Sequence, residues 1–250
     1  MKNELYFAIL PLLGTFILLC AGPHSTDTGY TYKIHRLADT LKIDANWDKA
    51  QWAEIPSLFI SNYMGDKPAF LPVTEAKVQY DDNNIYVIFR VQDRYVRAVE
   101  TKSQGRVWED ACVEFFFAPD SAEPLRYFNV EINCGGTVLM YFNRVPEVDR
   151  TPLAFEDINQ MEIAHTMPKI VDPEITEPVT WVLEYRLPLA VLEKYTNLTY
   201  PKPGVTWRAN FQKCAETNSH PHWLTWAKID YPTPKFHMPQ FFGKIEFANY

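Results

Sequence analysis

Apolar and polar residues alternate along three separate segments of this 250-residue chain. VEFFF, residues 113–117, puts Val and two Phe on one parity, and YFNVEIN, 127–133, alternates Phe, Val and Ile with Asn, Glu and Asn. In WRANFQKC, 207–214, Trp, Ala and Phe alternate with Arg, Asn and Gln. A period of two is typical of β-strands, whose successive side chains point to opposite faces. Each segment is therefore predicted to be a strand with an apolar core face and a hydrogen-bonding face.

A β-hairpin is predicted over residues 76–93, AKVQYDDNNIYVIFRVQD. Two alternating apolar runs flank the DDNN sequence at 81–84, whose residue types tolerate turn conformations. The nine-residue connection at 118–126 likewise makes strands 113–117 and 127–133 plausible neighbours. Local pairing is thus expected to be antiparallel.

Composition favours an all-β fold. Aromatic residues make up 15% of the chain, Pro (19) outnumbers Gly (9), and long amphipathic helical patterns are scarce. We predict one domain, an immunoglobulin-like or jelly-roll-type antiparallel β-sandwich of two sheets. Helix is expected only in short connectors such as 187–195.

The N-terminus has the pattern of an export signal. Lys2 precedes an apolar run over 5–19, which is long enough for a signal core and too short for a bilayer span. We predict a signal peptide over 1–21, a linker over 22–31 and the folded domain over 32–250. Cys20 leaves a lipid anchor in the outer membrane and plain secretion as open alternatives. The protein is expected to be secreted, periplasmic or on the cell surface.

Charge and cysteine usage exclude some functions. The net charge of −7 and the pI near 5.4 provide no positive field for a phosphate backbone, so nucleic acid is not an expected partner. Cys112, Cys134 and Cys214 show no spacing typical of zinc sites, and no metal site is predicted. Buried free thiols are the expected state of these three cysteines.

The polar parity of the predicted strands suits a polyhydroxylated ligand. Carboxylates accept hydrogen bonds from hydroxyls, and Asn and Gln both donate and accept. The residues concerned are Glu114, Asn129, Glu131, Asn210 and Gln212. The competing interpretation is a polar sheet face that simply contacts water, as antiparallel sheets often have.

Aromatic residues favour the ligand interpretation. Trp108 precedes the first of these strands, and the proline-stiffened segment 221–243 supplies Trp223, Trp226, Tyr231 and Phe236. Aromatic walls around a polar floor would form a saccharide slot, because the C–H faces of pyranose rings stack on indole. Trp226 lies in a strand-like stretch and is the first candidate for a core position.

Two other functions remain open from the residues alone. Glu114 and Glu131 could act as the acid and base of a glycoside hydrolase, since both could face one side of neighbouring strands. A haem-binding sandwich would instead use His237 or a methionine as axial ligand.

The chain resembles the family 9 carbohydrate-binding modules, especially the stand-alone family 9-like proteins of polysaccharide-degrading bacteria, over residues 32–250. The resemblance rests on the order of five segments: IDANWDKAQW, KVQYDDNNIYVIFRVQD, WEDACVEFFFAPD, YFNVEIN and FHMPQFFGKIEF. Members of this family are β-sandwiches that hold the reducing-end sugar of glycans such as xylan and cellulose between two tryptophans. Some of them contain structural calcium, but this sequence shows no residue spacing typical of a calcium-binding loop.

The resemblance implies roles for individual residues. Trp108 takes the place of the first stacking tryptophan, Phe236 that of the second, and Glu114 that of a sugar-binding glutamate. Three floor positions depart from the family: Asn129 stands for an arginine, Glu131 for an asparagine and Asn210 for a glutamine.

We therefore predict an exported, non-catalytic, monomeric protein without a required cofactor. It would capture plant-type poly- or oligosaccharides and support their degradation.

Overall fold

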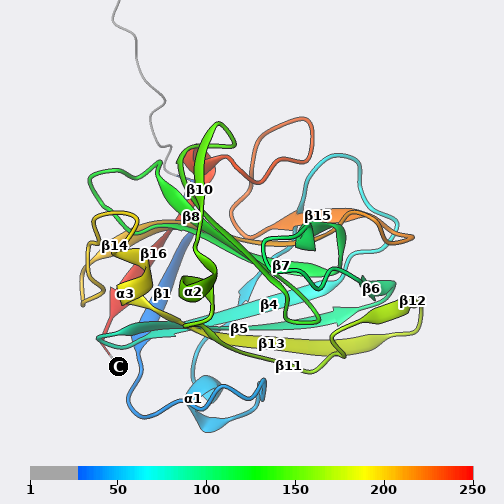
Figure 1. Cartoon of the computed structure of the whole chain (residues 1–250), viewed down its shortest axis with the longest axis horizontal. Coiled ribbons are helices and arrows are strands. Elements are labelled where there is room, and N and C mark those ends of the chain that lie inside the picture. The colour runs from blue at the N-terminus through cyan, green and yellow to red at the C-terminus, as the bar shows by residue number, and fades with distance from the viewer. Residues whose placement is uncertain (1–27, 250) are drawn as a thin grey trace, which may run out of the picture.

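The computed structural model describes residues 28–249, and β-strands dominate it (Figure 1). The predicted signal peptide, Cys20 and most of the predicted linker lie outside the described residues. The first strand, β1, begins at Thr31, close to the predicted start of the domain. The part of the chain that is described contains no helix with the length and apolar character needed to cross a bilayer.

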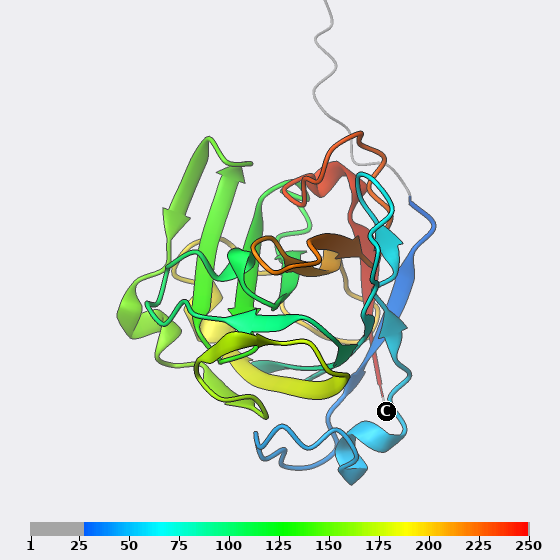
Figure 2. The same ribbon diagram turned by 90° about the vertical axis from the view of Figure 1, so that its right-hand side faces the viewer.

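The strands form one hydrogen-bonded sheet that folds over on itself. Its first layer follows the order β10 (Asp149–Pro152), β9 (Val138–Val145), β8 (Tyr127–Asn133), β7 (Cys112–Ala118), β14 (Thr206–Ala215) and β16 (Gly243–Ala248). The second layer continues with β1 (Thr31–Arg36), β4 (Val73–Tyr80), β5 (Asn84–Asp93), β13 (Val179–Pro188) and β11 (Glu162–His165). Figure 2 shows the green strands of the first layer on the left and blue β1 with red β16 on the right.

Short elements complete the fold. The remaining strands are β2 (Leu58–Phe59), β3 (Asn62–Tyr63), β6 (Val96–Ala98), β12 (Val171–Ile175) and β15 (His222–Thr225). β15 extends the first layer beside β14, while β6 and β12 form a separate two-stranded sheet. The helices are α1 (Ala50–Ala53), α2 (Phe155–Ile158) and α3 (Leu189–Leu192), with 3-10 turns η1 (Val107–Glu109) and η2 (Pro239–Phe241).

The predicted all-β sandwich class and the β4–β5 hairpin are confirmed, and one detail differs. Two antiparallel sheets were expected, but β1 pairs in parallel with both β16 and β4 and joins the layers into one sheet. Local alternation could not reveal this, because the partners of β1 are distant in sequence.

The core lies between the two layers and contains the predicted apolar parity. Phe115 stacks on Phe211 with ring centroids 4.5 Å apart, and Phe117 stacks on Trp207 at 5.7 Å. Trp226 is also buried, as expected, and meets Phe211 edge-on at 5.8 Å. These aromatic contacts between β7, β14 and the segment after β15 fix the packing of the first layer.

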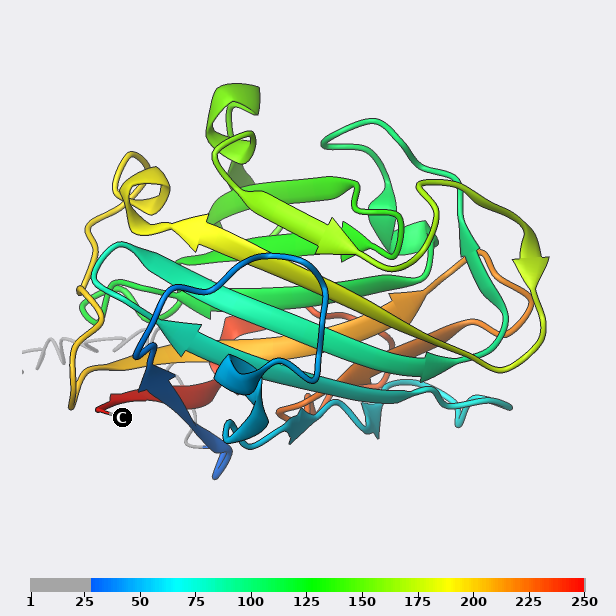
Figure 3. The same cartoon turned by 90° about the horizontal axis from the view of Figure 1, so that it is seen from below.

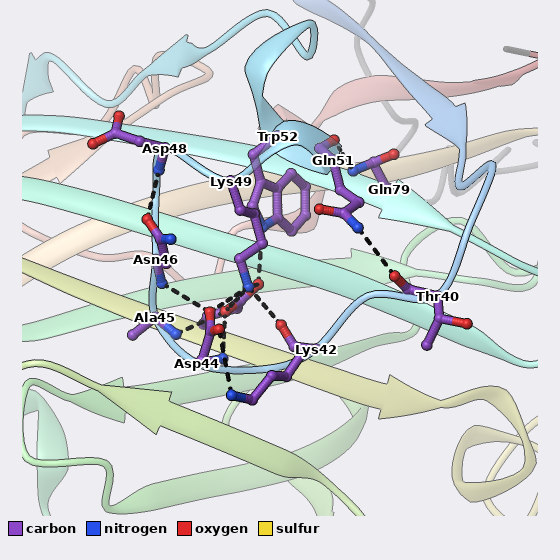
Figure 4. A network of polar contacts seen from close by, with 11 residues as sticks. Thr40, Lys42, Asp44, Ala45, Asn46, Asp48, Lys49, Gln51, Trp52 and Gln79 are labelled. Atoms are coloured by element: carbon purple, nitrogen blue, oxygen red, sulfur yellow. Dashed lines mark hydrogen bonds and ion pairs between the residues drawn. The ribbon is translucent and has the colours of Figure 1, made fainter.

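Loop 37–57 covers the outer face of the second layer (Figure 3). The side chain of Glu184 on β13 is fully buried beneath it and accepts hydrogen bonds from the Ala45 amide at 2.8 Å and Trp52 Nε1 at 2.8 Å. Lys49 Nζ lies 2.9 Å from the same carboxylate. Figure 4 shows how this network holds the loop, and the fully buried Trp52 is one of its packing residues.

The outer face of the first layer is covered as well. Every residue of β7 and β8 is buried on both parities. A second apolar cluster, built from Val107 in η1, Phe236 and Phe242 among others, packs over this face. The polar parity therefore does not form an open, water-covered face.

Candidate functional site

Strand register arranges the polar parity of the first layer in cross-strand rows. The central row crosses β15, β14, β7, β8 and β9 and contains Thr225, Gln212, Glu114, Glu131 and Leu139. The row on one side of it contains Trp223, Cys214, Cys112 and Asn133, and the row on the other side contains Asn210, Phe116, Asn129 and Tyr141. Residues paired in this way share one face, so the rows form a continuous floor.

A cavity of about 410 Å³ stands on this floor, within the size range of ligand pockets. Four of the predicted site residues line it together: Trp108, Glu114, Glu131 and Phe236. They come from η1, β7, β8 and the loop before η2, so segments far apart in the sequence converge here.

Glu114 lies at the centre of the floor and is almost fully buried. Its Oε1 accepts a hydrogen bond from Cys214 Sγ at 3.1 Å, whereas Oε2 has no hydrogen-bond partner among residues 28–249. Burial, together with the nearby Cys214 and Glu131, raises the pKa of this carboxyl well above its usual range. A protonated carboxyl can donate one hydrogen bond and accept others, which is the capacity needed to bind a hydroxyl group.

Glu131 lies directly opposite Glu114, and a chain of two asparagine hydrogen bonds positions its carboxyl group. Asn129 Nδ2 donates to Glu131 Oε1 at 2.8 Å, and Asn143 Nδ2 donates to Asn129 Oδ1 at 2.7 Å. Burial raises the pKa of Glu131 to about 7, although the Asn129 hydrogen bond opposes this shift. Asn129 does not line the cavity, so the structure places it as a support for Glu131.

Asn210 also lies away from the cavity lining. Its Nδ2 donates to the Ala227 carbonyl at 2.9 Å, and its Oδ1 accepts from the amides of Phe211 and Ala227. These bonds anchor the segment after β15 to β14. In contrast, both amide atoms of Gln212, directly opposite Glu114, are buried without a hydrogen-bond partner in the described chain.

Aromatic rings form the cavity walls. Trp108 is partly exposed, with its backbone carbonyl 3.5 Å from Cys214 Sγ and the Arg106 guanidinium 5.8 Å from its ring centroid. Trp223 and Phe236 line the cavity as well, and Trp223 Nε1 donates to Glu216 Oε1 at 2.9 Å. Polar contacts thus position the two tryptophans of the cavity wall.

Charged and ionisable groups surround the remaining wall. Lys235 pairs with Glu147 at 2.7 Å, and the Arg150 guanidinium lies 4.7 Å from the Tyr141 ring centroid. His237 Nδ1 is 2.7 Å from the hydroxyl oxygen of Tyr127, and burial lowers its pKa to about 4. His237 is therefore neutral at physiological pH.

Trp223, one of the predicted wall aromatics, lines the cavity as expected. The remaining lining residues were not predicted as part of a saccharide slot: Gln104, Phe116, Leu139, Tyr141, Glu147, Arg150, Cys214, Glu216, Pro234, Lys235 and His237. The pairing of β14 with β15, which places Trp223 opposite Cys214, was not visible in the periodicity. The β9–β10 hairpin that carries Glu147 and Arg150 offered no pattern that linked it to the site.

Comparison with known proteins identifies the family of this chain. The family sequence model of carbohydrate-binding family 9 matches residues 40–247. This chain belongs to carbohydrate-binding family 9. Modules of this family bind carbohydrate and are non-catalytic, so the glycoside hydrolase alternative is not supported. A search of curated proteins found no match.

Solved structures of similar fold agree with family 9 membership. A candidate carbohydrate-binding protein from Bacteroides uniformis has a TM-score of 0.77 and 25% identity, covering 87% of this chain and 98% of its own. A family 9 module from Caldicellulosiruptor kristjanssonii in complex with cellotriose has a TM-score of 0.60 and 15% identity, covering 88% and 95%. The glucose complex of a family 9 module from the same organism has a TM-score of 0.58 and 16% identity, covering 87% and 96%. At these lower identities the likeness concerns the fold.

Proposed function

We propose that this protein is an exported binding protein that captures plant-type poly- or oligosaccharides in the cavity above β7 and β8. The observation that carries the proposal is Glu114 Oε2, which is buried at the floor of an aromatic-walled cavity and has no hydrogen-bond partner among residues 28–249. A buried polar atom without a partner costs free energy, and a ligand hydroxyl would supply the missing hydrogen bond.

The chemistry of the cavity supports a neutral ligand. Glu114 and Glu131 both have raised pKa values, so the floor offers carboxyl groups that donate and accept hydrogen bonds. Two cationic side chains line the cavity, and both are engaged: Lys235 pairs with Glu147 and the Arg150 guanidinium lies over the Tyr141 ring. The rings of Trp108, Trp223 and Phe236 provide surfaces on which pyranose rings stack.

The two Caldicellulosiruptor complexes contain cellotriose and glucose, and they guide the choice of ligands to test. We infer that gluco- and xylo-configured oligosaccharides are the relevant class. Export and a supporting role in polysaccharide degradation belong to the same proposal and rest on the N-terminal sequence and the family.

Titration calorimetry with glucose, cello-oligosaccharides and xylo-oligosaccharides tests the binding. Trp108→Ala and Glu114→Gln should each weaken binding, while Phe155→Ala, an exposed aromatic residue outside the cavity lining, should leave it unchanged. Sugar products should not appear on prolonged incubation. The proposal fails if none of these saccharides binds, or if products form and disappear in Glu131→Gln.

A further inference from the structure

Two cysteines and a glutamate converge at the floor of the cavity. Cys112 and Glu114 are two residues apart on β7 and share a face, and Cys214 on β14 is directly opposite Cys112. One ligand atom from each residue lies within 4.8 Å of the other two, and all three side chains are buried. Their separation in sequence explains why cysteine spacing gave no sign of this cluster.

The spacing of the cluster suits a tetrahedral metal ion. Zinc–ligand lengths place two tetrahedral sulfurs about 3.8 Å apart and a sulfur and an oxygen about 3.6 Å apart. Cys214 Sγ already lies 3.1 Å from Glu114 Oε1. Small side-chain rotations would bring the three atoms onto one ion.

A disulfide fits the same pair less well. Directly opposite residues of antiparallel strands have Cβ atoms about 4.5–5.5 Å apart, whereas a disulfide needs about 3.5–4.5 Å. Cys112 and Cys214 are such an opposite pair and are free thiols in the structure. An ion that bridges two sulfurs requires no closer approach of the strands.

The donor set selects the class of metal. Two sulfurs exclude calcium and magnesium, which take oxygen ligands, and favour soft or borderline ions. Glu114 Oε2, buried and unpartnered among the described residues, is available for a fourth contact or for the cavity. Glu114 and Cys214 both line the cavity, which gives an ion a route of entry.

We propose that Cys112, Glu114 and Cys214 form a three-ligand site for a zinc-type divalent cation, with its fourth coordination position facing the cavity. In that position the ion would bind water or a hydroxyl group of a bound ligand. The site differs from structural zinc centres, in which protein ligands occupy all four positions.

Cobalt(II) titration of the reduced full-length protein, without sugar, tests the site. Thiolate-to-cobalt charge-transfer absorption should appear and saturate at one ion per chain, and zinc should displace cobalt. Cys112→Ser and Cys214→Ser should each weaken cobalt binding by at least about 100-fold, beyond the 10–100-fold typical of outer-shell changes. Glu114→Gln should retain the absorption, because both sulfurs remain, and should lower the cobalt affinity at least about tenfold, since even outer-shell changes cost about 10–100-fold.

Cys134→Ser and Cys20→Ser are the matched controls, and both should bind cobalt as the parent does. In the unmodified protein, zinc should also slow the reaction of two thiols with a thiol reagent, a readout that needs no variant. Absence of charge-transfer absorption, its persistence in Cys214→Ser, or an unchanged affinity in Glu114→Gln would overturn the proposal. So would a Cys112–Cys214 disulfide in protein recovered without reductant. Because sugar is absent throughout, the outcome is independent of the saccharide assays.

Discussion

Replacement of Trp108 and of Trp207 by alanine should separate ligand binding from stability. Trp207 is 1% exposed, stacks on Phe117 at 5.7 Å, meets Phe247 edge-on at 4.9 Å, and donates from Nε1 to the Thr199 carbonyl at 2.8 Å. Truncation of such a residue costs about 3–5 kcal/mol of the free energy of unfolding. For a chain of this size that corresponds to a fall in Tm of roughly 6–20 °C.

Trp108 has a different setting. It is partly exposed at the cavity wall, and its best-defined polar contact, from Cys214 Sγ, is to the backbone carbonyl, which alanine retains. Trp108→Ala should therefore melt close to the parent. Loss of a stacking surface worth about 1 kcal/mol or more should lower saccharide affinity at least about fivefold.

Thermal unfolding and calorimetry on both variants provide the measurement. Trp207→Ala is expected to lose stability and, in the fraction that remains folded, to bind saccharide. If Trp108→Ala binds normally and melts far below the parent, Trp108 is a core residue and the assignment of this wall is wrong.

Three further predictions concern buried acids and the N-terminus. Because burial raises the pKa of Glu131 to about 7, the free energy of unfolding falls as pH rises from about 4.5 to 7. In urea unfolding, the free energy of unfolding of Glu131→Gln should therefore exceed that of the parent by up to about 3 kcal/mol at pH 8 and by almost nothing at pH 4. Equal gains at the two pH values would contradict this explanation. Glu184→Ala should cost about 2–6 kcal/mol, because the Ala45 amide and Trp52 Nε1 lose their buried acceptor at about 1–3 kcal/mol each, while Lys49 keeps its pairing with Asp44. A loss below about 1 kcal/mol in chemical unfolding would show the network to be dispensable. Protein recovered from its native envelope should begin near residues 20–22 by intact mass, with a diacylglycerol adduct if Cys20 is lipidated, whereas a retained Met1 would refute export.

Alternation along the chain was sufficient to assign faces to strands. The parity of Phe115 and Phe211 correctly placed both in the core, and the opposite parity correctly placed Glu114 and Glu131 side by side. Parity assigns a face, but it does not say which polar group on that face reaches a cavity. Asn129 and Asn210 share the face and are engaged by neighbouring protein groups instead.

The covering of the floor could not be predicted from the sequence. The polar face is buried because η1 and the loop that carries Phe236 lie over it, and these segments have no regular period. The partnership of Cys112 with Cys214 depends on the β7–β14 pairing, which joins distant parts of the chain. Whether the six predicted residues bind sugar stays a prediction for the saccharide assays.

The parallel pairing of β1 with β16 has a consequence for how the chain folds. Thr31 pairs with Lys244 and His35 with Ala248, so β1 and β16 form the seam between the layers. Until β16 has been synthesised, the edge of β1 that it covers stays unpaired among the described residues, and the two layers are not joined into one sheet. Such long-range closure is slow, because the loop entropy is lost before the contacts form. Deletion of 243–249 should therefore leave a chain that collapses without cooperative unfolding, a result that calorimetry of the truncated protein can check.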